Sequence, residues 1–181
     1  MKRVLIPLAP GFEVIEAATV LDILRRVRIE VTVAAERVAP IEAMHGFQIV
    51  PDTTLDAVNP ADFDMLVVLG GDGAMQLKDD PRLRRIIVEM ADKGAFLAAI
   101  CRGPVVLAAA GVLDGKRVTS SPSTRDDLAG ATYVEDRVVV DGRVITSRLP
   151  GTAMEFALKL VEVLCGERHA NYVGTAVAAR S

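Results

Sequence analysis

The sequence predicts an α/β protein in which helices cover both faces of a mostly parallel sheet. Three largely apolar runs, at residues 4–9, 64–69 and 95–100, are typical of strands buried on both sides. Segments with helical spacing of apolar residues alternate with these runs. Strands that alternate with helices in this way form parallel sheets. The length of 181 residues fits a single domain.

Composition argues against several classes of protein. Hydrophobic residues make up 51% of the chain, enough for a sizeable core, and the net charge is −3 without a Lys/Arg run. A nucleic acid is therefore not expected as a main partner. No apolar stretch approaches the ~18 residues of a membrane span, and Pro7 and Pro10 interrupt the N-terminal run, unlike a secretory signal. Two cysteines make no disulfide framework, which favours a reducing cytoplasm.

The first third of the chain predicts a strand, a helix, a second strand and an irregular segment. Apolar residues recur at helical spacing after Phe12 and indicate a helix that ends near Arg26. The expected ranges are 4–9 and 31–35 for the strands, 13–26 for the helix, and 36–51 for the irregular segment with a short strand at 47–50.

A glycine-rich turn, Gly70-Gly71-Asp72-Gly73, follows the strand at 64–69. Glycines let backbone N–H groups approach a ligand closely. The turn does not match the three-glycine dinucleotide fingerprint, because Gln76 stands at the third position, and no GK[ST] follows. We therefore interpret it as an oxyanion-binding loop.

The second half of the chain predicts three helices and a hairpin. Asp80 as N-cap and Pro81 at the first position begin one helix. An Asp-Gly pair between β-branched runs predicts a hairpin with a type I′ turn, and Thr152 to Glu155 has the pattern of a capping box. The expected ranges are 81–93, 104–110 and 152–165 for helices, 118–120 for a short strand, 124–128 for one helical turn, and 138–145 for the hairpin.

Cys101 stands on a sharp turn between the strand at 95–100 and the next helix. Pro104 near the start and Gly111 just past the end define that helix. Such a turn projects a side chain out of the sheet, as in nucleophile elbows. It also places the sulfur near a helix N-terminus, where we expect a lowered thiol pKa. The alternative is a buried cysteine that acts as a small hydrophobe.

Glu16 interrupts the apolar face of the first helix within its first turn. An ordinary charge at a helix N-terminus is one interpretation. The other places Glu16 near Cys101, because ligands of open α/β sheets bind where the carboxyl ends of the strands meet. His45, in the irregular segment, is interpreted as a solvated or structural residue.

Five motifs, in this order, resemble those of the ThiJ/PfpI superfamily, also called the DJ-one family. They are LAPGFE at 8–13 with Glu16, VLGG at 68–71, AAICRGP at 98–104, VTSSP at 118–122, and TS with PGT between 146 and 152. The resemblance covers nearly the whole chain. It implies a flavodoxin-like three-layer sandwich, one class I glutamine amidotransferase-like domain over residues 1–181, and usually a homodimer.

The resemblance also implies a nucleophilic site. Cys101 matches the family's nucleophilic, oxidation-sensitive cysteine, and Glu16 matches the acid that contacts it. Gly71 and Arg102 match positions whose backbone N–H groups hold an oxyanion, and Gly70 belongs to the same turn. No metal or other cofactor is implied.

Four positions are basic in some members or differ from the family pattern. Arg26 and His45 resemble basic positions that approach the site across the dimer interface. Ser121 stands where the best-studied members have a His, and Arg102 stands where the peptidase-like branch has one. The missing Cys–His dyad disfavours a peptidase, so proton transfer falls to Glu16, His45 or water. The Arg102 charge is expected either to lower the Cys101 pKa and attract anionic substrates or to be solvated.

Three functions fit these residues. The first is a glutathione-independent glyoxalase or deglycase that acts on methylglyoxal-type carbonyls, with Cys101 as thiolate nucleophile and Glu16 moving the proton. The second is a non-enzymatic sensor of oxidative stress in which Cys101 oxidises to a sulfinate. The third is a PfpI-like cysteine peptidase or an isonitrile hydratase-like enzyme. We expect a cytoplasmic homodimer with a small carbonyl substrate and no membrane partner.

Overall fold

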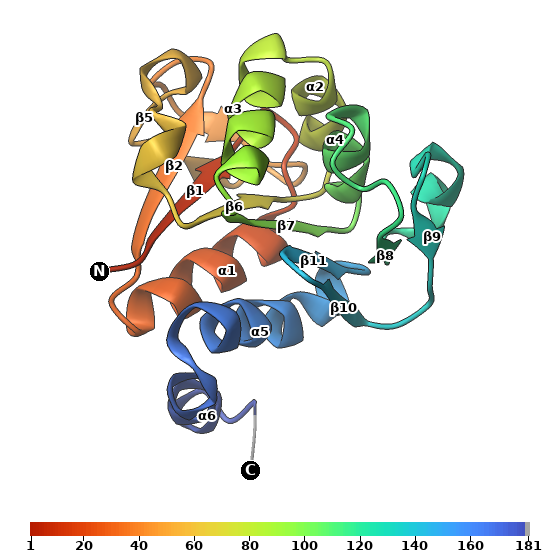
Figure 1. Cartoon of the computed structure of the whole chain (residues 1–181). Helices are drawn as coiled ribbons and strands as arrows, with labels where there is room; N and C mark the ends of the chain where they lie inside the picture. The colour runs from red at the N-terminus through yellow and green to blue at the C-terminus, as the bar shows by residue number, and fades with distance from the viewer. Residues whose placement is uncertain (180–181) are drawn as a thin grey trace.

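A seven-stranded sheet forms the middle layer of the computed structural model, which describes residues 1–179 (Figure 1). The strand order is β10-β11-β7-β6-β1-β2-β5, and every pair is parallel except the antiparallel β10–β11 hairpin. The strands are β1 (Arg3–Pro7), β2 (Glu30–Ala35), β5 (Thr53–Thr54), β6 (Met65–Val68), β7 (Phe96–Ile100), β10 (Val138–Asp141) and β11 (Val144–Ser147).

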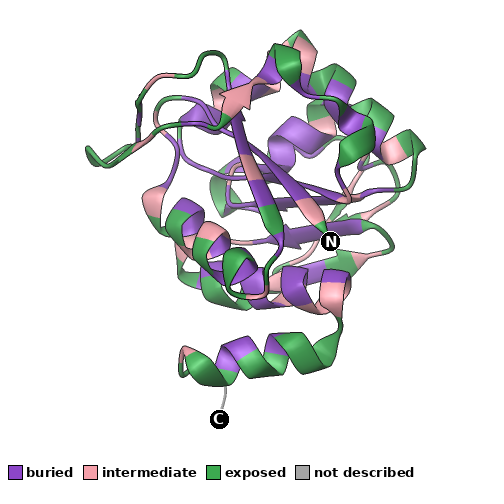
Figure 2. Ribbon diagram, turned by 90° about the vertical axis from the view of Figure 1, so that its left-hand side faces the viewer, coloured by how far each residue is buried: buried purple, intermediate pink, exposed green. Residues whose placement is uncertain are grey.

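Helices cover both faces of this sheet, which confirms the predicted three-layer α/β architecture (Figures 1 and 2). One face carries α1 (Val14–Arg26) and α5 (Ala153–Cys165), with α6 (Glu167–Ala176) packed against α5. The other face carries α2 (Gly73–Lys78), α3 (Pro81–Asp92) and α4 (Pro104–Ala109). Each face has its own apolar core. The central strands are buried on both sides, which explains their continuous apolar sequences.

Two helices that the sequence analysis did not predict are α2 and α6. The glycine-rich turn at residues 70–73 continues directly into α2. In α6, only Ala170, Val173 and Gly174 are buried, so its apolar stripe is narrow and the segment looks like a polar tail in the sequence. Gly166, with φ +90°, redirects the chain between α5 and α6.

The predicted capping box of the last helix is wrong. The Thr152 hydroxyl makes no cap bond to α5. It instead lies 2.6 Å from the Ser147 hydroxyl and donates to the Leu149 carbonyl at 2.8 Å, in the short turn η4 (Pro150–Thr152). Glu155 pairs with Arg137 rather than with the backbone. The N-cap at Asp80 is confirmed, because its carboxylate accepts from the Arg82 N–H at 2.8 Å.

The remaining elements are short and lie outside the seven-stranded sheet. The hairpin predicted around Asp141 is present, with Asp141 opposite Val144. The predicted type I′ turn is wrong, because the two turn residues are Gly142 and Arg143 and only Gly142 has a positive φ. The segment expected to be irregular contains a second small hairpin. These short elements are β3 (Ile41–Glu42), β4 (Gln48–Ile49), β8 (Arg117–Val118), β9 (Thr132–Tyr133), η1 (Leu55–Ala57), η2 (Pro60–Asp62) and η3 (Pro122–Asp127).

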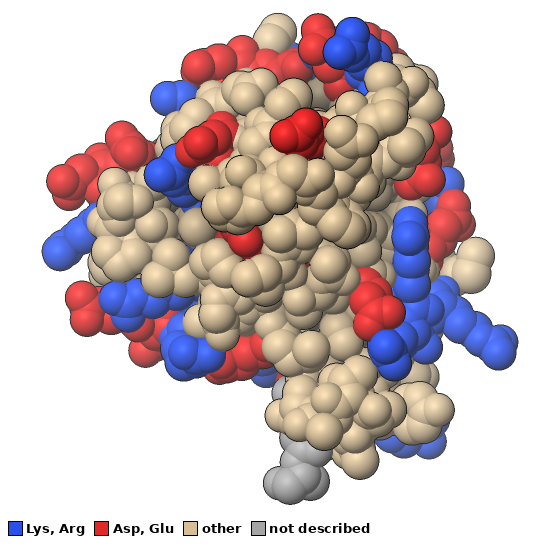
Figure 3. Space-filling model, turned by 180° about the vertical axis from the view of Figure 1, so that it is seen from behind, with Lys and Arg blue, Asp and Glu red and all other residues tan. Residues whose placement is uncertain are grey.

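Two observations describe the outside of the molecule. No helix within residues 1–179 is both long and apolar enough to cross a membrane. Figure 3 shows Lys and Arg side chains in separate groups toward the rim of the face seen from behind, where the middle is mostly uncharged with a few acidic side chains.

Candidate active site

The carboxyl ends of β1, β6 and β7 meet at one edge of the sheet. These three strands are neighbours in the sheet. The chain builds the sheet outward from β1 in one direction with β2 and β5, and then in the opposite direction from β6 with β7 and β11, so the strand order reverses between β1 and β6. Ligands of open α/β sheets bind at such a reversal. Glu16, Gly70 and Cys101 follow these three strands, so the topology brings them to this edge.

Cys101 adopts a left-handed backbone conformation, with φ +60°. This conformation is costly for a residue with a side chain and persists only where its surroundings hold it. The Cys101 N–H donates to the Ser147 carbonyl at 3.0 Å, and the Cys101 carbonyl accepts from the Ser121 N–H at 2.8 Å. The side chain is 7% exposed, so it is mostly buried without being fully enclosed. The predicted sharp strand-to-helix turn is therefore present.

Two glycines leave room for this turn. A Cβ at Gly70 would lie 2.6 Å from Cys101 Cβ and 3.0 Å from a carboxyl oxygen of Glu16. A Cβ at Gly103 would overlap the Val68 carbonyl. Both positions therefore require glycine for steric reasons.

The backbone N–H groups of Gly71 and Arg102 face the Cys101 sulfur and favour its anion. Gly71 has φ +83° and forms an isolated bridge with Phe12, which fixes the direction of the turn. Two N–H groups that face a nucleophile are positioned to bind an oxygen anion formed next to it.

Glu16 is fully buried beside Cys101. Its Oε2 accepts from the Gly70 N–H at 2.6 Å, and its buried Oε1 accepts no hydrogen bond from the described residues. Burial raises the pKa of Glu16 from 4.5 to about 7, and the charge of Glu13 also raises it. Because Oε2 already accepts from the Gly70 N–H, a neutral Glu16 would carry its proton on Oε1. The carboxyl group as a whole lies within interaction range of the Cys101 thiol.

Glu13 is a site residue that the sequence analysis missed. It is the N-cap of α1, and its buried carboxylate accepts from the Glu16 N–H at 2.8 Å. The sequence did indicate this role, because an acidic residue stands at the start of the helix, three positions before Glu16, where N-cap residues accept backbone hydrogen bonds. Glu13 therefore orients the first turn of α1 and favours the neutral form of Glu16.

The lowered Cys101 pKa expected from the helix N-terminus is not what this arrangement produces. Burial, followed by the charge of Glu16 and a hydrogen bond to it, raises the pKa of Cys101 to about 12. The two backbone N–H groups lower it only in part. The helix itself starts at Pro104, beyond the turn, and is short. Both the charge of Glu16 and the hydrogen bond to it raise the Cys101 pKa only while Glu16 is ionised. The thiol and the carboxyl group therefore titrate as a pair, which holds a single proton after the first one has left.

Arg102 and Ser121 contribute through their backbones. The Arg102 guanidinium pairs with the exposed carboxylate of Asp72 and is not among the groups that shift the Cys101 pKa. The expected effect of its charge on the thiol is therefore not found. The Ser121 hydroxyl lies 2.9 Å from that of Ser123, while its N–H holds the elbow.

The model of the DJ-1/PfpI family matches residues 2–163 of this sequence. The chain belongs to that family. It is 40% identical to protein DJ-1 homolog A of Arabidopsis thaliana over 99% of this chain and 47% of that protein, so it spans about half the length of this relative.

Two shorter family members are matched over most of their length. The chain is 38% identical to the glutathione-independent glyoxalase DJR-1.2 of Caenorhabditis elegans, over 94% of this chain and 92% of that protein. It is 37% identical to the deglycase PYRAB04690 of Pyrococcus abyssi, over 90% and 99%.

Solved structures of family members have the same fold. Drosophila melanogaster DJ-1beta superposes with a TM-score of 0.93, at 40% identity over 98% of this chain and 97% of that one. An oxidized form of Toxoplasma gondii DJ-1 also gives 0.93, at 32% identity over 98% of both chains.

Within one chain of this DJ-1/PfpI family member, Arg26 and His45 do not reach Cys101. Arg26 pairs with Asp22 at the far end of α1, ~15 Å along the helix from Glu16. His45 is exposed between β3 and β4. Their approach to the site across a dimer remains a prediction.

No group of three or more His, Cys, Asp or Glu residues suited to a metal ion occurs within the described part of the chain.

Proposed function

We propose that this protein is a cofactor-free glyoxalase or deglycase that acts on methylglyoxal-type carbonyls. One observation carries the proposal: the Cys101 sulfur lies between two backbone N–H donors and a buried glutamic acid whose pKa is about 7. A nucleophile, an oxyanion site and a proton carrier are what addition to an aldehyde requires. The relatives named as a glyoxalase and a deglycase support the same reaction class.

The first step is addition of sulfur to the aldehyde carbon. Glu16 takes the thiol proton, a C–S bond forms, and the C=O electron pair moves to oxygen as an alkoxide. The N–H groups of Gly71 and Arg102 stabilise that alkoxide, which then takes the proton from Glu16. The product is a neutral hemithioacetal.

The second step moves a proton between neighbouring carbons. The Glu16 carboxylate removes the proton from the sulfur-bearing carbon, giving an enediolate with its negative charge on the former ketone oxygen. The hydroxyl proton moves to that oxygen, and Glu16 returns its proton to the adjacent carbon, which forms a 2-hydroxy thioester. Water then cleaves the C–S bond. Methylglyoxal and one water become lactate and a proton, and the thiol is restored.

Lactate formation without glutathione tests this proposal. The purified protein is incubated with methylglyoxal, and Cys101→Ser and Glu16→Gln are run in parallel. We expect lactate from the wild type only. Turnover no higher than that of Cys101→Ser would reject the enzyme and leave the architecture unaffected.

A second candidate function is a sensor of oxidative stress. The sulfur, with its two N–H donors, could hold sulfinate oxygens in the same place, and a solved relative is an oxidized form. Two peroxide molecules would transfer two oxygen atoms to Cys101 and leave as two waters. Intact-mass measurement after mild peroxide tests it: preferential oxidation of Cys165 would oppose this function.

The PfpI-like peptidase and isonitrile hydratase-like alternatives have less support. Neither His45 nor His169 forms a hydrogen bond with Cys101 within residues 1–179. Casein cleavage that disappears in Cys101→Ala would restore the peptidase.

The homodimer and the cytoplasmic location also belong to this proposal. Ile15, Phe47 and Val50 are more than half exposed, and Phe47 and Val50 line a hollow of about 270 Å³ beside α1. An apolar surface of this kind favours association, and Arg26 and His45 lie on the same elements, α1 and the β3–β4 hairpin. The two free cysteines fit a reducing compartment.

A further inference from the structure

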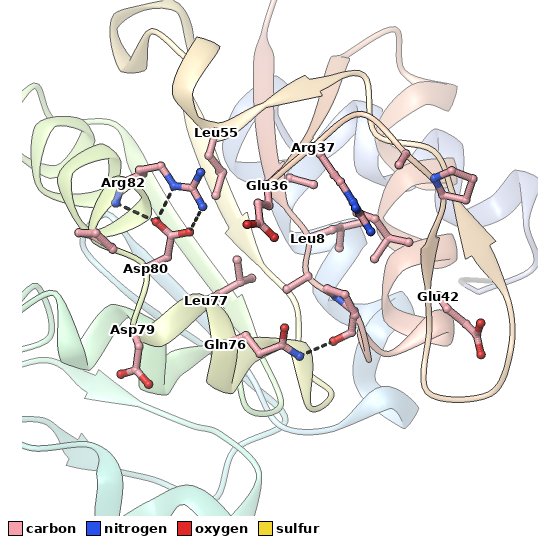
Figure 4. Close-up of a pocket in the computed structure, with 17 residues that line it drawn as sticks. Leu8, Glu36, Arg37, Glu42, Leu55, Gln76, Leu77, Asp79, Asp80 and Arg82 are labelled. Atoms are coloured by element: carbon pink, nitrogen blue, oxygen red, sulfur yellow. Dashed lines mark hydrogen bonds and ion pairs between the residues drawn. The ribbon is translucent and has the colours of Figure 1, made fainter.

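A cavity of about 700 Å³ opens at the carboxyl ends of β1 and β2 (Figure 4). It lies between the strand ends and the segment from α2 to the start of α3. Neither Cys101, Glu16, Gly70 nor Gly71 lines it. The cavity is therefore separate from the candidate active site, and its size is that of small-molecule sites.

Much of the cavity wall is apolar. Leu8, Leu55 and Leu77 are almost completely buried in the fold and still contribute to its lining. Gln76 crosses one side and donates to the Pro10 carbonyl at 3.0 Å, which fixes that wall. A ligand with an apolar body would bury surface here.

Two opposite charges at the mouth have no partner. Glu36 and Arg37 follow β2 directly, are exposed, and form no ion pair with any of residues 1–179. Figure 4 shows the Glu36 carboxylate and the Arg37 side chain directed over the apolar walls. Of the other charged residues that line the cavity, Arg82 binds Asp80 at 2.6 Å, whereas Glu42 and Asp79 add two carboxylates that form no ion pair within residues 1–179.

We propose that this cavity binds a zwitterionic, apolar ligand of dipeptide size. Its ammonium group would face Glu36, its carboxylate would face Arg37, and its apolar side chains would contact the leucines. A single amino acid would fill only a small part of the cavity. This site goes beyond the proposed carbonyl chemistry and needs neither Cys101 nor Glu16.

Three probes that share the same apolar side chains and differ only in their end charges test this proposal. Each is titrated into the full chain and followed by NMR. They are leucyl-phenylalanine, its N-acetyl form without the cation, and its C-terminal amide without the anion. We expect amide shifts at Glu36 and Leu77 with an affinity on the order of 1 mM. Each blocked form should bind about three- to fivefold more weakly, the range of an exposed ion pair.

Charge variants assign each contact. Glu36→Gln should remove the difference between the free and N-acetyl dipeptides, and Arg37→Gln should remove the difference between the free and amidated forms. Both side chains are exposed, so these variants should fold. Ala39→Trp should obstruct the cavity and abolish binding by all three probes.

Several results would overturn the site. These are equal binding of the three probes, binding of only one singly charged form, shifts centred on Gly71 and Arg102, or no saturable shift. Binding to Cys101→Ser should match the wild type. A failed lactate assay and a failed titration are therefore distinguishable.

Discussion

Glu16 and Cys101 form one titrating pair, although 101 − 16 = 85 positions separate them in the sequence. The charge of Glu16 raises the pKa of Cys101, and the hydrogen bond with Cys101 lowers the pKa of Glu16. The first proton that the pair releases therefore leaves near pH 7, where Glu16 titrates. After that step, sulfur and carboxyl group hold one proton between them.

The pH dependence of thiol alkylation should follow this pair. In a Cys165→Ser background, iodoacetamide should react with Cys101 at a rate that rises with a midpoint near pH 7, where the pKa of Glu16 lies. Thiolate paired with neutral Glu16 is the reacting form. Stopped samples analysed by intact mass give the rate at each pH.

Glu16→Gln is the matched control for that profile. Gln keeps the shape and can accept from the Gly70 N–H, but it cannot take the thiol proton. Of the causes that raise the pKa of Cys101, only burial then remains, so the midpoint should move above 9.0, the ordinary value of a thiol. An unchanged profile in Glu16→Gln would contradict the shared proton.

Glu16 should also make folding stability depend on pH. Its folded-state pKa, about 7, lies above the ordinary value of 4.5, so the folded state retains a proton that the unfolded state has released. This contribution is complete below pH 4.5 and is lost as pH rises through about 7. Relative to Glu16→Gln, the wild type should lose on the order of 2–3 kcal/mol between those values.

Urea denaturation of both proteins at a series of pH values measures this difference. A constant gap in the free energy of unfolding between Glu16→Gln and the wild type would mean that Glu16 is already charged at low pH.

Gly70→Ala should disrupt the site by crowding. The added Cβ would lie 2.6 Å from Cys101 Cβ, closer than real side chains pack, so the elbow must shift. We expect lactate formation to fall by about tenfold or more, and stability by about 1–3 kcal/mol. Gly151→Ala, where a Cβ meets nothing within 4 Å, is the control. Equal activity in both variants would show that Gly70 is not sterically required.

The central layer of the fold could be predicted because its strands carry their own pattern. Strands β1, β6 and β7 are buried on both faces, so their sequences are continuously apolar. The helix α6 could not be predicted in this way, since its few buried residues depend on contacts with α5. The prediction that Thr152 caps the last helix was wrong because the Thr152 hydroxyl instead contacts the hydroxyl of Ser147, at the end of β11.

The position of the candidate site could be predicted from the sequence, but the pKa shifts of its residues could not. Turn chemistry placed Cys101 and Gly71 at the sheet edge, but the pKa shifts depend on burial, which the sequence does not state. Glu13 was missed because its role requires the orientation of the Glu16 N–H. The cavity near Glu36 combines four separate segments of the chain, none of which has a recognisable motif.

Arg102→Ala should change the thiol very little. The guanidinium pairs with Asp72 at the surface, whereas the backbone N–H, which alanine retains, faces the sulfur. We expect the alkylation rate of Cys101 at pH 7 to stay within about twofold of the wild type, since exposed ion pairs contribute little. Asp72→Ala is the matched variant that frees the guanidinium. A loss of about tenfold in Arg102→Ala would instead assign the charge itself a role in activating the thiol.

Phe47→Glu should separate the proposed dimer. Phe47 is 52% exposed at the apolar hollow beside α1, and a carboxylate there would be buried without a partner if two copies pack on this face. Tyr172→Glu, which changes a 73% exposed aromatic residue on α6, is the control. Analytical ultracentrifugation should give a dimer for the wild type and Tyr172→Glu, and a monomer for Phe47→Glu. If the wild type is a monomer at all concentrations, Arg26 and His45 have no route to Cys101, and proton transfer must rest on Glu16 and water.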